Sequence, residues 1–85
     1  MPLLPGETRP VASIPFGTSG TLSLGRLARA NGLRLATLGL RSGTEVTVLS
    51  RTAGGGRLVG VGTSRIGIDR DTSRRLELFV AGSPA

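Results

Sequence analysis

The stretch LATLGLRSGTEVTVL, residues 35–49, changes its hydrophobic period at a single joint. Leucines at helical spacing precede Gly39, and a glycine directly after a helix can adopt the positive φ that ends it. From Thr44 onward apolar and polar residues alternate, which is typical of a half-buried strand. The segment therefore predicts a helix over residues 33–38, a tight turn at Gly43 and a strand after it. Both glycines are expected to act through their backbone alone, as structural turn residues.

Outside this joint, short alternating apolar runs bounded by turn residues predict further strands. The five predicted strands are residues 8–16, 44–51, 57–62, 65–69 and 75–80. Many glycines separate them, and tight barrel corners favour residues without a Cβ atom. The pattern predicts a mainly β protein: a five-stranded SH3-like small barrel with one or two short helices after the first strand.

The helical insert is expected between the first two strands. Residues 17–20 predict a loop, and Thr21 or Ser23 is placed to cap the helix that follows. Leu35, Leu38 and Leu40 are expected to pack on the barrel. A further helical turn is predicted over residues 70–74, with Asp69 or Asp71 at its start.

The chain has 85 residues, which predicts one domain over residues 7–80, with a flexible leader over residues 1–6 and a flexible tail over residues 81–85. It contains no cysteine, so no disulfide framework is expected. The first residues lack the basic region of a signal peptide, and no apolar run approaches the ~20 residues that span a bilayer. We therefore expect a cytoplasmic protein.

Residues able to carry catalysis or bind metal are scarce. There is no histidine, cysteine or lysine, which excludes tetrahedral zinc sites and leaves the serines without a base. Asp69 and Asp71 are fewer carboxylates than a calcium site needs. The glycine-rich loop at residues 53–56 joins two predicted strands, whereas phosphate-binding loops lead into a helix. No catalytic residue, metal ligand or cofactor is predicted, and an enzyme is not expected.

All 11 basic residues are arginines, and the net charge is +6. Arginine suits phosphate and carboxylate partners, although exclusive arginine beside many alanines and glycines is also typical of codon bias. One hypothesis is therefore a basic small barrel that binds nucleic acid or acts as a regulatory interaction module. The absence of Tyr and Trp, which would stack on bases, makes nucleic acid the less favoured partner.

The helical insert is also rich in leucine, beyond what a short cover over a barrel end requires. Such a surplus favours a protein-binding face. The residues assigned to it are Leu24, Arg26, Leu27, Arg29 and Arg34. Weak self-association through the same leucines is a further hypothesis.

Two segments resemble the FeoA family of bacterial ferrous iron transport proteins. RLATLGLRSGTEVTVLSR is similar to the family's helix end, turn and strand, and GGGRLVGVGTSRIGIDRDTSRRLEL resembles its second hairpin and closing strand. Together they cover residues 34–78. The chain departs from the family pattern at Ser42, where proline is usual, at RTAGGG, which lacks the proline expected after the arginine, and at Gly67, where alanine is usual.

The resemblance implies an SH3-like barrel that binds the cytosolic portion of FeoB, a membrane transporter with a GTP-binding domain. It also implies a non-enzymatic accessory or regulatory protein of ferrous iron uptake with no small-molecule substrate. The same fold occurs as an interaction module at the end of metalloregulators of the diphtheria-toxin-repressor type. The direction of any effect on transport is left open.

Overall fold

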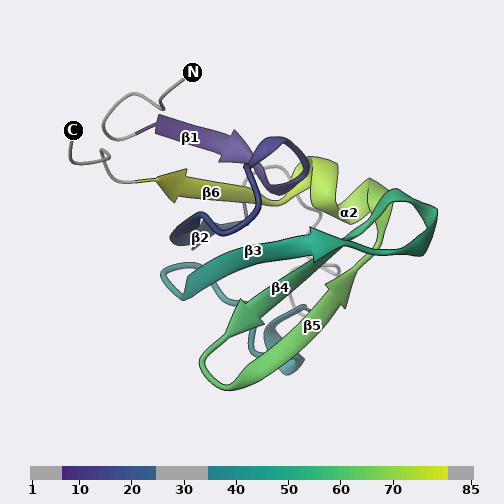
Figure 1. Ribbon diagram of the computed structural model, residues 1–85. Helices are drawn as coiled ribbons and strands as arrows, with labels where there is room; N and C mark the ends of the chain where they lie inside the picture. The colour runs from purple at the N-terminus through teal and green to yellow at the C-terminus, as the bar shows by residue number, and fades with distance from the viewer. Residues whose placement is uncertain (1–6, 25–34, 81–85) are drawn as a thin grey trace.

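The computed structural model describes residues 7–24 and 35–80, and these form one antiparallel sheet with short helices (Figure 1). The elements are β1 (Glu7–Pro10), η1 (Val11–Ser13), β2 (Ser19–Ser23), β3 (Glu45–Arg51), η2 (Ala53–Gly55), β4 (Arg57–Val61), β5 (Ser64–Ile68), α2 (Arg70–Arg75) and β6 (Glu77–Val80). The strand order is β1-β6-β2-β3-β4-β5. The predicted mainly β architecture is confirmed, although the described residues form six strands and not five. The predicted leader, the predicted tail and residues 25–34 of the predicted insert lie outside the described residues.

The predicted first strand over residues 8–16 is too long. β1 ends at Pro10, which has φ −60° and no N–H to donate to a partner strand. The chain then turns through η1, and the amide of Val11 donates to the carbonyl of Leu76 at 2.7 Å. This turn brings η1 beside α2, where Figure 1 shows the two short helices together at one end of the sheet.

Strand β2 replaces the predicted loop and helix start, so the expected caps at Thr21 and Ser23 are wrong. β2 pairs with β6 on one side and with β3 on the other. A Cβ atom at Gly20 would lie 2.8 Å from the carbonyl oxygen of Phe79, so the glycine permits the close approach of β6. The pairing partners are distant in sequence, and their hydrogen bonds override the weak helical spacing after residue 20.

The core lies inside the bent sheet and consists almost entirely of aliphatic side chains. Its buried members are Val11, Ile14, Leu22, Leu40, Val46, Val48, Val59, Ile68, Leu76, Leu78 and Val80. The alternation predicted from Thr44 onward is seen in β3, where Val46 and Val48 are buried, and in β6, where Leu78 and Val80 are buried. Leu35 is half-buried against the core, whereas Leu38 is 54% exposed, so its predicted core position is wrong. Leu38 is the last residue before Gly39, where the chain turns back and carries Leu40 inward instead.

The joint at residues 35–49 has the geometry of a Schellman helix end. The amide of Leu40 donates to the carbonyl of Leu35, and that of Gly39 donates to Ala36, each at 3.0 Å. Gly39 has φ 93° and Gly43 has φ 91°. An added Cβ would meet no atom within 4 Å at either position, so the backbone conformation and not lack of space favours glycine there.

Candidate functional site

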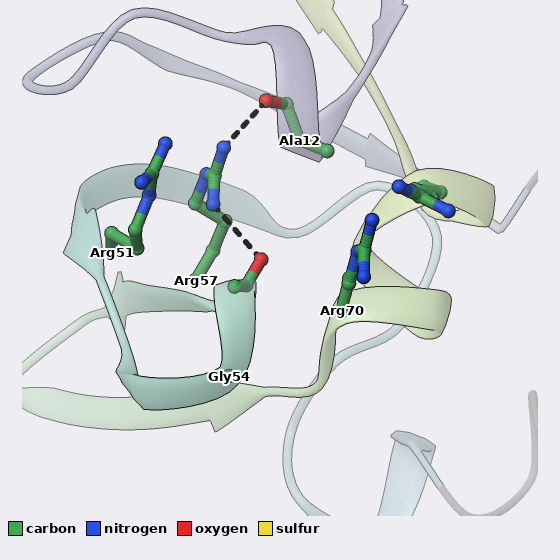
Figure 2. Close-up of a pocket in the computed structure, with 7 residues that line it drawn as sticks. Ala12, Arg51, Gly54, Arg57 and Arg70 are labelled. Atoms are coloured by element: carbon green, nitrogen blue, oxygen red, sulfur yellow. Dashed lines mark hydrogen bonds between the residues drawn. The ribbon is translucent and has the colours of Figure 1, made fainter.

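A basic pocket lies between the β3–β4 hairpin, η1 and α2 (Figure 2). Its volume is about 470 Å³, within the ~300–1,000 Å³ range of small-molecule sites. The residues that line it are Ala12, Arg51, Gly54, Gly55, Arg57, Arg70 and Arg74. We call this feature the arginine pocket. Four guanidinium groups from three elements therefore line one hollow.

Arg57 is the half-buried member of the arginine pocket. Its Nη1 donates to the carbonyls of Gly55 at 3.1 Å and Gly56 at 2.9 Å, and its Nη2 donates to the carbonyl of Ala12 at 2.9 Å. Its guanidinium carbon lies 5.7 Å from the ring centroid of Phe16, within cation–π range. The side chain is thereby fixed between the hairpin and η1, and its charge is held by carbonyl dipoles.

One donor of Arg57 has no partner. Its Nε is buried and makes no hydrogen bond among the described residues. Buried polar atoms are normally satisfied by protein or by another molecule. Among the described residues, Arg57 is therefore the arginine of the pocket with a buried donor that lacks a partner.

The other arginines of the pocket come from the hairpin and from α2. Arg51, at the end of β3, lies directly opposite Arg57 in the strand register. The aliphatic carbons of Arg70 lie over Gly55, where an added Cβ would be 3.3 Å from Cδ. Figure 2 shows Arg51 and Arg70 on the two sides of Arg57. Asp69 caps the helix that carries Arg70, and its Oδ1 accepts from the amide of Thr72 at 2.7 Å.

No ion pair within 4 Å joins an arginine of the pocket to a carboxylate of the described residues. Among the described residues, the ion pairs within 4 Å join Arg9 to Glu7 at 3.9 Å and Arg75 to Asp71 at 3.4 Å, both outside the pocket lining. Four cationic groups without such a partner produce a positive local potential that attracts anions.

The predicted protein-binding residues fall mostly outside the described residues. Arg26, Leu27, Arg29 and Arg34 cannot be placed. Leu24 is half-buried against the core, and its amide donates to Oγ of Ser42 at 3.4 Å. Ser42, which departs from the usual proline of the turn, therefore ties the end of the β2 segment to the turn before β3.

Sequence reasoning did not find the arginine pocket. It placed its candidate arginines in the helical insert, whereas the pocket combines the β3–β4 hairpin with α2. One signal was available: Arg51 and Arg57 flank a short strand connection, and residues that flank a hairpin loop face each other across it. The contribution of α2 depends on tertiary packing and carries no local signal.

The described residues contain no group of three or more His, Cys, Asp or Glu side chains placed to hold a metal ion. Over residues 7–24 and 35–80, no helix is long and apolar enough to cross a membrane. Large exposed apolar side chains occur at Phe16, Leu38 and Phe79.

Solved structures place this architecture among small SH3-like barrels. An iron uptake regulatory protein, FeoA, aligns with a TM-score of 0.75 at 20% identity, over 86% of this chain and 97% of that chain. FeoA from Stenotrophomonas maltophilia, in complex with zinc, aligns with a TM-score of 0.60 at 28% identity, over 78% of this chain and 84% of that one. That protein is described as a prokaryotic SH3-domain protein, with a suggested role as a ferrous iron transport activating factor.

IdeR from T. acidophilum also shares the fold. The TM-score is 0.75 at 20% identity, and the match covers 92% of this chain but 36% of that chain. The barrel therefore also occurs as part of a larger protein. A comparison with curated protein sequences gives no significant match.

The class defined by the fold is thus a small SH3-like barrel, and the sequence identifies the family within that class. The FeoA domain model matches residues 9–78, which is most of the chain. The chain belongs to the FeoA family, and the predicted resemblance is confirmed.

Proposed function

We propose that this protein is a non-enzymatic accessory protein of bacterial ferrous iron uptake that binds the cytosolic part of a FeoB-type transporter. The observation that carries the proposal is the FeoA domain match over residues 9–78. The relative from Stenotrophomonas maltophilia, with its suggested role in activating ferrous iron transport, gives further support. The protein acts in the cytoplasm, where this part of the transporter is accessible.

The chemistry of the chain agrees with a role by contact. It has no histidine, cysteine or lysine, and therefore none of the usual neutral bases or thiolate nucleophiles. The arginine pocket supplies positive charge but no general base. These side chains are suited to binding a partner and not to catalysis.

We place the transporter contact on Leu24, Arg26, Leu27, Arg29 and Arg34. One described residue after this segment supports the placement. Leu38, which follows this segment, is 54% exposed, and an exposed large apolar side chain is typical of interfaces. Arginine is likewise enriched at interfaces, where its planar fork pairs with carboxylates.

A quantitative binding assay tests this placement. Arg26→Glu combined with Arg29→Glu should weaken binding to the purified cytosolic domain of the transporter by about tenfold or more, because like charges then face each other across the interface. The matched control is Arg41→Glu combined with Arg65→Glu, which changes net charge equally at exposed positions outside the proposed contact. Unchanged binding of the first pair, or equal losses in both, would overturn the placement.

A further inference from the structure

The arginine pocket carries an inference that goes beyond the transporter contact. We infer that it is a binding site for a small-molecule polyphosphate, a ligand with two or more linked phosphate groups. The inference does not depend on the proposed function, since it rests on the lining of this pocket alone.

The first observation is the unbalanced charge. Arg51, Arg57, Arg70 and Arg74 line one pocket of about 470 Å³, and none of them makes an ion pair with a described carboxylate. Arg51 and Arg57 also lie directly opposite each other in the strand register. Like charges opposed across an antiparallel pair destabilise a sheet. An anion between these groups removes that repulsion.

The second observation is the unpartnered Nε of Arg57. The Nη atoms of this side chain donate to three backbone carbonyls, which hold the guanidinium between the hairpin and η1. The aliphatic carbons of Arg70 lie close to Gly55, where an added Cβ would be 3.3 Å from Cδ. A pocket whose donors are already placed loses less side-chain entropy on binding.

The number of charges selects the ligand class. Arginine forks bind carboxylate and phosphate alike through paired hydrogen bonds. A single carboxylate would balance one guanidinium of the four, whereas each terminal phosphate carries roughly −1.5 to −2 near pH 7. The pocket volume also exceeds the needs of one small anion. A chain of linked phosphates matches both charge and size.

Calorimetric titration of the full chain with inorganic tripolyphosphate at low salt tests the inference. Arg51→Gln combined with Arg70→Gln should weaken binding by about tenfold or more, because hydrogen bonds to charged groups are the strong ones. Arg41→Gln combined with Arg65→Gln is the control, with the same loss of charge outside the arginine pocket, and should change affinity less than about threefold. Arg51 and Arg70 are exposed, so both pairs should keep the wild-type circular dichroism spectrum.

Two further titrations separate the sources of the phosphate groups. A nucleoside triphosphate that binds as tightly as tripolyphosphate supports a site for phosphate alone, and one that binds more tightly supports a nucleotide site. An oligonucleotide is titrated as well. The inference would be overturned, in favour of general surface charge, if the oligonucleotide bound, both pairs of substitutions weakened its binding equally, and tripolyphosphate did not bind. No binding of tripolyphosphate to the wild-type chain at low salt would also overturn it.

Discussion

Gly56 directly precedes β4 and Gly67 lies within β5, and the space around these two glycines differs. A Cβ atom at Gly56 would lie against the carbonyl oxygen of Ile68 and 2.7 Å from Oγ1 of Thr52. At Gly67 an added Cβ would meet nothing within 4 Å, and φ is not in the left-handed region. Only the first glycine is required by packing, and the second is replaceable by the alanine usual in the family pattern.

This contrast predicts opposite effects of the same substitution. Gly56→Ala should lower the free energy of unfolding by about 2–3 kcal/mol, because the neighbouring atom is backbone and cannot rotate away. Gly67→Ala should raise it by about 0.5–1 kcal/mol, because glycine in a strand costs conformational entropy. Urea denaturation of both variants measures the two changes. A neutral Gly56→Ala, or a Gly67→Ala that destabilises as much, would contradict the packing described.

At the scale of elements, Arg57 connects two elements that are distant in sequence, the β3–β4 hairpin and η1. Its hydrogen bonds join the β3–β4 hairpin to the carbonyl of Ala12 in η1. η1 interrupts the strand predicted over residues 8–16, so the Arg57 side chain helps to fix a turn that the sequence did not predict. The strands from residue 44 onward were predictable because alternation and turn glycines are local signals. β2 was not predictable, because Gly20 is typical of a loop in the sequence and its role in the close packing of β2 and β6 is visible only in the structure.

The loss of this connection has a measurable cost. Arg57→Met keeps much of the aliphatic stem but removes hydrogen bonds to three carbonyls. We expect the free energy of unfolding to fall by about 2 kcal/mol, the size typical of hydrogen bonds from a charged donor. Arg65→Met, at an exposed position of β5, should stay within about 0.5 kcal/mol of the wild type in the same urea titration. Equal stabilities of the two variants would show that Arg57 has no linking role.

At the scale of the whole molecule, two different sets of arginines carry the two proposals. One set belongs to the proposed transporter contact, which precedes residues 35–49 in the sequence and lies mostly outside the described residues, and the other lines the arginine pocket between the hairpin, η1 and α2. The first set was predicted from the composition of one leucine- and arginine-rich segment and stays a prediction. The second could not be predicted, because its arginines come together only when the sheet bends and α2 packs beside η1. The variants proposed for the two features change different residues, so each can be tested while the other stays intact.

We propose that this FeoA-family protein works by binding a ferrous iron transporter. The most direct measurement is co-purification of the tagged full-length chain with a FeoB-type transporter from the same cells, with the Arg26→Glu and Arg29→Glu double variant purified in parallel. We expect the transporter to be recovered with the wild-type chain and depleted with the double variant. A wild-type chain that recovers no transporter, under conditions in which both proteins are expressed and folded, would show that transporter binding is not its function.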